Sequence, residues 1–176
     1  PGHAILQARE FCDGEPFVTI FPDDVIFNDV SATEQLMQVY REHGGSVIAV
    51  NEAADEIIHT KGVVGGKSVG AGVHEVDALV EKPALKDAPS NLAIVARYLL
   101  DNAVFDYLSE EHEGVGGEVQ ITDAIASLLG NNPIHAREIN GFHADTGNPG
   151  GMLEAAIHVA KQDPELAKIV KQALID

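Results

Sequence analysis

Two short apolar runs separated by a helical pattern constrain the fold most. Residues 15–21 (Glu-Pro-Phe-Val-Thr-Ile-Phe) and 46–50 (Ser-Val-Ile-Ala-Val) are typical of buried strands. Between them, the capping box Ser31-Ala-Thr-Glu34 begins a helix that Gly44-Gly45 ends. A strand–helix–strand order predicts a right-handed parallel crossover.

The rest of the chain continues to alternate. We expect further strands over 73–80, 92–100 and 134–139, and helices over 4–11, 101–108, 122–129, 149–161 and beyond Asp163-Pro164. The helix at 122–129 is capped by Thr122 or Asp123. Gly65-Gly66 and Gly70-Ala-Gly72 are interpreted as hairpin turns, because no helix follows them and no Lys-Ser/Thr ends them.

This order of elements predicts an α/β fold. Its sheet should be mostly parallel and flanked by helices, with antiparallel or mixed pairings along the strands of the middle third. Loops are short throughout, so we expect a single domain over residues 1–176.

Composition excludes several classes of function. The chain has 28 acidic and 11 basic residues, a net charge of −17, which repels nucleic acid and anionic membranes. No apolar stretch approaches the roughly 20 residues that span a bilayer, and no signal-peptide pattern opens the chain. Cys12 is the one cysteine, which fits a reducing compartment. We therefore expect a cytoplasmic protein with no nucleic-acid or membrane partner.

An acid and a base stand together where an apolar run ends. Ala78-Leu79-Val80 leads into Glu81 and Lys82, and Pro83 ends regular pairing. A carboxylate accepts hydrogen bonds from sugar hydroxyls and an ammonium neutralises a phosphate, so the pair can grip a polyol phosphate. The alternative is a surface ion pair before a turn.

Carboxylates follow another strand. Asp23 and Asp24 come directly after the run that ends at Phe21, and paired carboxylates there suit a hard divalent cation. A turn or a helix cap is the alternative. Asp145 stands just before the helix start at Asn148-Pro149, either as a second metal ligand or as an acid favoured by the helix dipole. We interpret His143 as structural or exposed.

A glycine pair precedes one more candidate acid. Gly116-Gly117 lets the backbone approach a ligand closely, and Glu118 follows, before the next helix. A plain loop with a helix cap is the alternative.

Five motifs in this order resemble one family. The chain is similar to the bacterial UTP–glucose-1-phosphate uridylyltransferases, which are sugar-phosphate nucleotidyltransferases. Pro1-Gly-His-Ala4 also matches the end of a family motif beside the nucleotide base. The five motifs are Phe21-Pro-Asp-Asp-Val25, Leu79-Val-Glu-Lys-Pro83, Pro89-Ser-Asn-Leu-Ala-Ile-Val95, Gly116-Gly-Glu-Val-Gln-Ile-Thr-Asp-Ala124 and Asp145-Thr-Gly147.

The resemblance implies a reaction and a role for each candidate. Glucose 1-phosphate and UTP would give UDP-glucose and pyrophosphate, with Mg²⁺ as cofactor. Lys82 would bind the sugar phosphate and act in catalysis with Asp23, a Mg²⁺ ligand joined by Asp145. The substrate-binding residues would be Glu81 at the sugar hydroxyls, Glu118 in the sugar pocket and Gly2 near the uracil.

The chain departs from the family pattern in two ways. Ala96 stands where relatives usually have glycine, and the family's Gly-Thr-Arg triphosphate loop is missing. The resemblance therefore implies an N-terminally truncated fold, its C-terminal two-thirds, inactive alone. We expect an exposed sheet edge and a homo-oligomer, most simply a dimer. Two alternatives stay open: a non-catalytic domain that binds sugar phosphate or nucleotide sugar or serves in assembly, and a piece of a longer enzyme.

Overall fold

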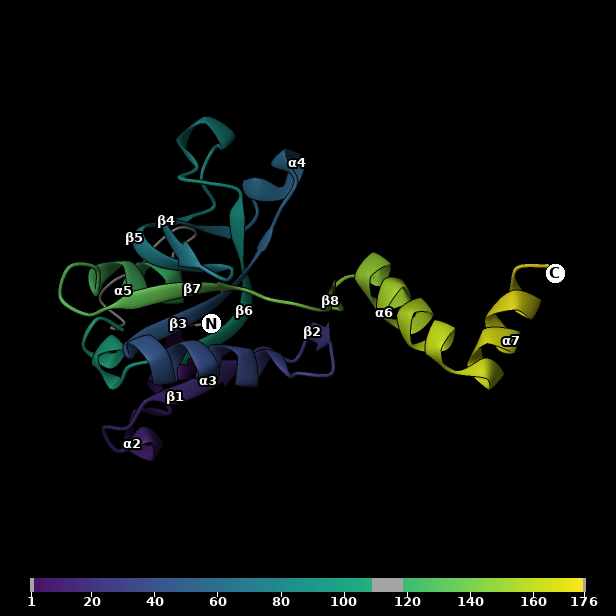
Figure 1. Ribbon diagram of the computed structural model, residues 1–176, viewed down its shortest axis with the longest axis horizontal. Coiled ribbons are helices and arrows are strands. Elements are labelled where there is room, and N and C mark those ends of the chain that lie inside the picture. The colour runs from purple at the N-terminus through teal and green to yellow at the C-terminus, as the bar shows by residue number, and fades with distance from the viewer. Residues whose placement is uncertain (1, 109–118, 176) are drawn as a thin grey trace. The chain divides into compact units, whose positions relative to one another are not determined.

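The computed structural model describes residues 2–108 and 119–175. They form two compact units, shown in Figure 1. Unit 1 comprises residues 1–20 and 30–140, and unit 2 comprises residues 21–29 and 141–176. Residues 30–140 of unit 1 are thus inserted in sequence between the two parts of unit 2. The single domain expected over 1–176 stays a prediction.

Unit 1 is built on a six-stranded sheet with the order β1-β6-β3-β7-β5-β4. The start of β6 also pairs with β4, through Val63 opposite Ala93 and Val64 opposite Leu92, so five strands close on themselves. Among the described strands, β1 pairs only with β6. The strands are β1 (Phe17–Ile20), β3 (Ser46–Glu52), β4 (Gly62–Gly70), β5 (Val73–Glu81), β6 (Leu92–Leu100) and β7 (Ile134–Glu138).

The expected α/β class is confirmed, but the expectation of mostly parallel pairing is wrong for the described strands. Only β3 and β7 pair in parallel among them. The reason lies in β6, which is apolar and buried along almost its whole length and so takes a central place. It runs antiparallel to both β1 and β3. The two strands of the predicted crossover therefore do run in the same direction, with β6 between them.

Helix α3 (Ala32–His43) follows the predicted capping box. The Ser31 hydroxyl accepts a hydrogen bond from the Glu34 backbone N–H at 3.1 Å, and Gly44 ends the helix at φ 71°. The helix packs on β3, β6 and β7 (Figure 1), and it buries Leu36 completely.

Gln35 of α3 holds the two ends of the inserted segment. Its side chain is buried and donates hydrogen bonds to the carbonyls of Val30 at 3.0 Å and Asn140 at 2.9 Å. Its amide oxygen accepts a third bond, from the Asn140 N–H at 2.9 Å. Gln35 and Asn140, which are 105 positions apart in sequence, are thereby joined.

The other helices of unit 1 are short. They are α1 (Gly2–Leu6), α2 (Arg9–Cys12), α4 (Asp55–Ile58), α5 (Ile121–Ser127) and the 3-10 helices η1 (Leu85–Asp87) and η2 (Asn102–Asp106). Asp101 caps η2, since its carboxylate accepts a hydrogen bond from the Ala103 N–H at 2.9 Å. The cap expected at Thr122 or Asp123 is wrong: α5 starts after Gln120, which makes no side-chain cap bond.

The two glycine segments differ from each other. Gly70-Ala71-Gly72 is the expected turn, with positive φ at all three residues. Gly65-Gly66 is not a turn but an irregularity within β4, where the register with β5 shifts. A Cβ at Gly66 would collide with the carbonyl oxygen of Glu75, so the strands can approach there only because the residue is glycine.

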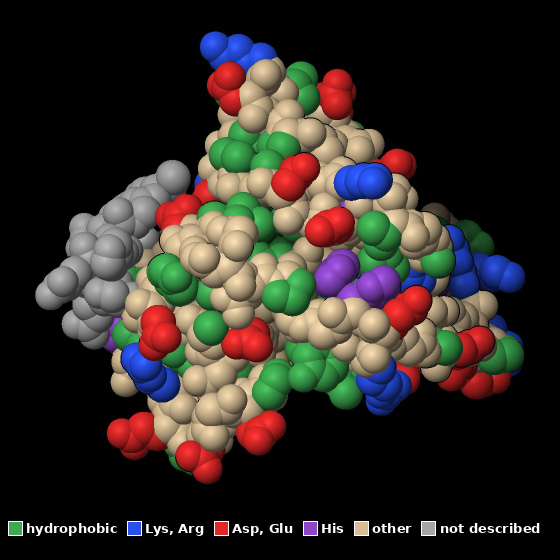
Figure 2. Space-filling view, turned by 60° about the vertical axis from the view of Figure 1, so that its left-hand side comes forward, with side chains coloured by type: hydrophobic (Ala, Val, Ile, Leu, Met, Phe, Trp, Pro, Cys, Tyr) green, Lys and Arg blue, Asp and Glu red, His purple; other side chains and the backbone are tan. Residues whose placement is uncertain are grey.

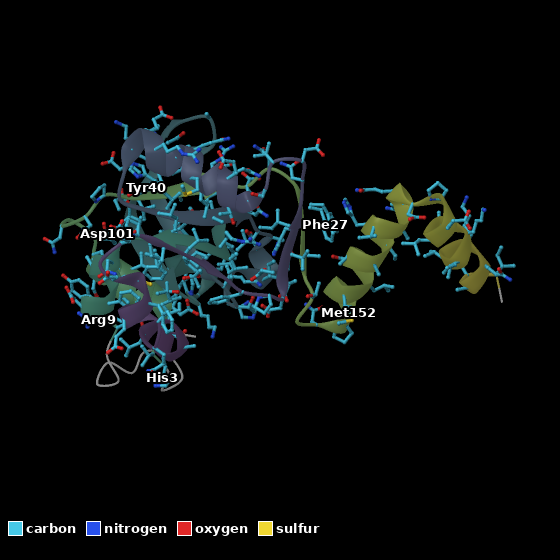
Figure 3. All side chains as sticks on the ribbon, turned by 90° about the horizontal axis from the view of Figure 1, so that it is seen from below. His3, Arg9, Phe27, Tyr40, Asp101 and Met152 are labelled. Carbon is cyan, nitrogen blue, oxygen red and sulfur yellow. The ribbon has the colours of Figure 1, made fainter. Side chains whose placement is uncertain are left out.

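Unit 2 consists of a two-stranded sheet and two helices. Strands β2 (Asp24–Phe27) and β8 (Phe142–Asp145), which the sequence did not predict, pair antiparallel. Helices α6 (Pro149–Gln162) and α7 (Pro164–Ala173) begin at the predicted Asn148-Pro149 and Asp163-Pro164 signals. Phe27, labelled in Figure 3, packs on His158 of α6 with ring centroids 5.0 Å apart.

The surface agrees with the acidic composition. Acidic side chains are spread over the face shown in Figure 2. Among the described helices none is both long and apolar enough to cross a membrane.

Candidate functional site

Glu81 ends β5 as a nearly buried carboxylate. Its side chain is only 10% exposed, and it lies opposite Gly62 in the register of β4 and β5. The hydroxyl of Thr122 on α5 donates a hydrogen bond to Glu81 Oε2 at 2.7 Å. This bond holds the Glu81 side chain in place through one of its two carboxylate oxygens.

Gly62 keeps space beside that carboxylate. A Cβ at this position would lie 3.0 Å from Glu81 Oε2 and 3.3 Å from the Thr122 hydroxyl oxygen. Such distances are shorter than ordinary van der Waals contact. A larger residue would therefore push Glu81 and Thr122 out of their present arrangement.

Lys82 is held in an unusual backbone conformation. Its φ is +47°, in the left-handed region that few non-glycine residues adopt. Its N–H donates to the Lys61 carbonyl at 3.0 Å, and its ammonium lies 3.7 Å from Glu81 Oε1 with the side chain 45% exposed. Local strain of this kind gathers at functional sites.

A second acid lies near Glu81. Burial, and then the charge of Glu81, raise the pKa of Asp123 above its ordinary value. Sequence reasoning treated Thr122 and Asp123 only as possible helix caps and did not single out Gly62. Their contacts with Glu81 join segments far apart in sequence, so no local signal marked them.

Unit 2 brings together Asp23 and Asp145, the two predicted metal ligands. Asp145 lies opposite Asp24 in the β2–β8 register, and Asp23 immediately precedes β2. A Cβ on Gly147 would lie 3.0 Å from Asp23 Oδ2 and 3.1 Å from Asp145 Oδ1. Both carboxylates thus border the space that this glycine leaves open. The Thr146 N–H, donating to the Asp23 carbonyl at 2.7 Å, ties the two segments.

This pair of carboxylates fits Mg²⁺. Magnesium is usually bound by one or two carboxylates, with waters and substrate phosphate oxygens completing its shell. No cluster of three or more histidine, cysteine or acidic residues suited to a metal occurs in the described part of the chain.

Asp24 and His143 contact each other within unit 2. The His143 Nε2 and Asp24 Oδ1 atoms are 2.5 Å apart, and both side chains are mostly buried. The expectation that His143 is structural or exposed stays a prediction. Of the two adjacent acids, only Asp23 faces Gly147.

The remaining predicted residues lie near the start of α5 or outside the described residues. Gly2 donates its N–H to the Val119 carbonyl at 3.0 Å, and a Cβ there would collide with the same oxygen. Its position near a uracil stays a prediction. Glu118 lies outside the described residues. Glu81, Lys82 and Gly2 belong to unit 1, and Asp23 and Asp145 to unit 2, so convergence of all of these on one ligand also stays a prediction.

Comparison with known proteins matches the chain to a family. The family model described as nucleotidyl transferase matches residues 2–162. The chain belongs to the nucleotidyl transferase family. The family resemblance noted in the sequence is thereby confirmed.

Individual relatives are more specific. The chain is 40% identical to a UTP–glucose-1-phosphate uridylyltransferase of Staphylococcus haemolyticus, over 97% of this chain and 61% of the relative. It is equally similar to one of Staphylococcus epidermidis, over 97% of this chain and 59% of the relative. The chain therefore spans about 60% of the length of these curated relatives.

Solved structures give the same picture. A UDP-glucose pyrophosphorylase complexed with UDP-glucose superposes with a TM-score of 0.86 at 36% identity, covering 92% of this chain and 62% of that one. A UTP-bound UDP-glucose pyrophosphorylase of Acinetobacter baumannii gives 0.83 at 27% identity, with 99% and 61% covered. The nucleotidyltransferase fold expected from the sequence is thus confirmed.

Proposed function

We propose that this chain provides the sugar-phosphate and metal sites of a UTP–glucose-1-phosphate uridylyltransferase. The observation that carries the proposal is Glu81, fixed by Thr122, beside the strained and half-exposed Lys82. An ammonium and a carboxylate held side by side suit a ligand with a phosphate at one end and hydroxyls at the other. The names of the relatives support glucose 1-phosphate as that ligand.

In the proposed reaction, an oxygen of the sugar phosphate attacks the α-phosphorus of UTP in line, and pyrophosphate leaves. Lys82 binds the phosphate of glucose 1-phosphate and orients the attacking oxygen, while Glu81 accepts hydrogen bonds from the sugar hydroxyls. Neither residue forms a covalent bond, so their contribution is positioning and charge neutralisation. Gly2 and Glu118 are proposed to contact the uracil and the sugar.

Asp23 and Asp145 would hold Mg²⁺, which supplies a positive charge that stabilises the phosphate oxygens during transfer. Gly147 keeps the space between the two carboxylates open, and the Thr146 bond to Asp23 holds the segments in place.

Substitution of Lys82 tests the proposal. Wild type should bind glucose 1-phosphate in the presence of Mg²⁺. Lys82→Ala should weaken that binding about tenfold or more, because a hydrogen bond to a charged group contributes roughly 1.5–3 kcal/mol. Isothermal titration calorimetry at fixed ionic strength measures both dissociation constants.

The matched control is Lys86→Ala, since Lys86 is an exposed lysine of η1 four positions along the chain. It should bind like wild type. Equal affinity in wild type, Lys82→Ala and Lys86→Ala would return the Glu81–Lys82 pair to an ordinary surface ion pair. Absence of binding in wild type would refute the proposed function.

A further inference from the structure

A cavity in unit 2 lies beside a cluster of three aromatic rings. Phe27 of β2, Phe142 of β8 and His158 of α6 all line this cavity, whose volume is about 580 Å³. The His158 and Phe142 rings are parallel, with 2° between their planes and 4.2 Å between their centroids, and Phe27 packs against both. Sites for small molecules typically have roughly 300–1,000 Å³ and walls rich in aromatic side chains. The cavity therefore has the size and the wall of a small-ligand site.

The polar groups of this cavity are hydrogen-bond acceptors. Asp29, shortly after the end of β2, is exposed, and its carboxylate forms no hydrogen bond or ion pair with any described residue. The amide nitrogen of Gln162 lies 2.9 Å from His158 Nε2. It donates to that unprotonated ring nitrogen, which leaves the amide oxygen of Gln162 as an acceptor. No lysine or arginine is among the described residues that line the cavity.

Attachment of α6 to the two strands explains the ring cluster but not the space beside it. That space is bordered by aromatic rings and by a carboxylate that has no partner among the described residues. The face of an aromatic ring attracts a cation through the quadrupole of the ring, and the carboxylate adds a full negative charge. The net charge of −17 disfavours an anion in the same place. An organic cation is therefore the ligand that fits.

We propose that this cavity binds a guanidinium group, carried by free arginine or a similar small compound. Guanidinium is planar and weakly hydrated, it stacks on aromatic faces, and it forms two parallel hydrogen bonds with a carboxylate. Its plane would lie against the aromatic wall, and its N–H groups would reach Asp29 and the amide oxygen of Gln162. The inference concerns unit 2 alone and does not depend on the proposed function.

Isothermal titration calorimetry of the whole chain with L-arginine, at fixed ionic strength, tests the site. Wild type should bind arginine saturably, with a dissociation constant of about 1 mM or lower. Asp29→Asn should weaken binding about tenfold or more, because it removes the charge-assisted contact. Glu154→Gln is the matched control, since it removes one negative charge from an exposed position of α6 outside the cavity. It should bind arginine like wild type.

Changes in the ligand test the chemistry of recognition. L-Citrulline has the shape of arginine but an uncharged urea group, and L-lysine has the charge without the plane, so both should bind more weakly than arginine. N-Acetyl-L-arginine amide represents an arginine residue of a peptide. Tighter binding of this compound than of arginine would support the guanidinium site with a protein side chain as its source, and the reverse order would support a free metabolite.

Three results would overturn the inference. The first is no saturable binding in wild type up to about 10 mM arginine, a concentration that fills most of a site with a millimolar dissociation constant. The second is equal affinity in wild type and Asp29→Asn. The third is binding of citrulline or lysine as tight as that of arginine, which would leave no preference for a guanidinium group.

Discussion

At the scale of single residues, Gly147 is important because it has no side chain. Asp23 Oδ2 and Asp145 Oδ1 each come within about 3 Å of the position where its Cβ would stand (3.0 and 3.1 Å). A methyl group there would occupy the space in which the two carboxylates could bind one cation. The oxygens belong to side-chain ends that can rotate away, so the backbone need not move.

We therefore expect Gly147→Ala to weaken divalent-cation binding about tenfold, while the melting temperature changes little, because the two carboxylates would no longer meet at one ion. Water-proton relaxation with Mn²⁺ in place of Mg²⁺ measures the dissociation constant directly. Gly150→Ala, in the first turn of α6, is the control and should bind like wild type. Unchanged Mn²⁺ affinity in Gly147→Ala would argue against a metal between Asp23 and Asp145.

Residue-level reasoning from the sequence located the strand-end acids and the lysine but missed their supports. Glu81, Lys82 and Asp23 each follow an apolar run, which is a local signal. Thr122 reaches Glu81 from 41 positions away, and Gly62 is placed opposite Glu81 only by the register of β4 with β5. Contacts of this kind depend on tertiary packing, which no short motif contains.

At the scale of secondary-structure elements, a pair of histidines joins α3 to β7. His43, the last residue of α3, stacks on His135 of β7 with ring centroids 4.7 Å apart. His135 is only 7% exposed, and its Nδ1 has no hydrogen-bond partner among the described residues. Burial, followed by the neighbouring His43, lowers the pKa of His135, while Glu75 and the backbone of Gly44 act in the opposite direction.

This predicts a loss of stability in acid. The folded protein binds a proton at His135 less readily than the unfolded chain, so the free energy of unfolding should decrease as the pH falls below about 6.5, the ordinary pKa of histidine. His135→Phe keeps a stacked ring without a titrating group and should flatten that part of the profile. Urea unfolding between pH 7.5 and pH 5.5 measures it.

The control for this experiment is His59→Gln, at an exposed histidine that follows α4. It should retain the slope of wild type. A wild-type profile that is level across this range, or an unchanged slope in His135→Phe, would contradict the prediction.

Elements with strong end signals were the ones that the sequence predicted well. The capping box at Ser31, the Asn148-Pro149 and Asp163-Pro164 starts and the long apolar β6 were all identified. The four-residue strands β2 and β8 were not, because each is too short to show a period. The direction of pairing was also misjudged, since the apolar pattern of β6 marks a central strand without saying whether its neighbours are parallel or antiparallel.

At the scale of the whole molecule, unit 2 has an apolar groove open to solvent. Its volume is about 420 Å³, and its lining comes from β2, α6 and α7: Phe27, Ala155, Ala156, Val159, Ala160, Leu166, Ile169 and Val170. Ile169 remains 64% exposed. Open apolar surface of this kind favours association.

We expect the chain to self-associate, most simply as a dimer, because symmetric dimers are the commonest soluble oligomers. Multi-angle light scattering over a hundredfold range of concentration should show the change in mass. Ile169→Glu should shift the equilibrium toward monomer by about tenfold or more, since it places a charge in the groove. Ile57→Glu, at an exposed isoleucine of unit 1, is the matched control. A monomeric mass at every concentration would contradict the expectation.

Gln35 has a consequence for the order in which the protein folds. His143 and Asp24, on the paired strands of unit 2, are 119 positions apart in sequence, so in an unfolded chain their pairing must close a very long loop. Gln35 binds Val30 and Asn140, the two residues at which the inserted segment begins and ends. Once unit 1 has folded, that loop is already closed, and β2 and β8 can pair as readily as the two arms of a short hairpin. The carboxylates of Asp23 and Asp145 would then be among the last groups to be assembled, and a refolding experiment should register cation binding only after the sheet of unit 1 has formed.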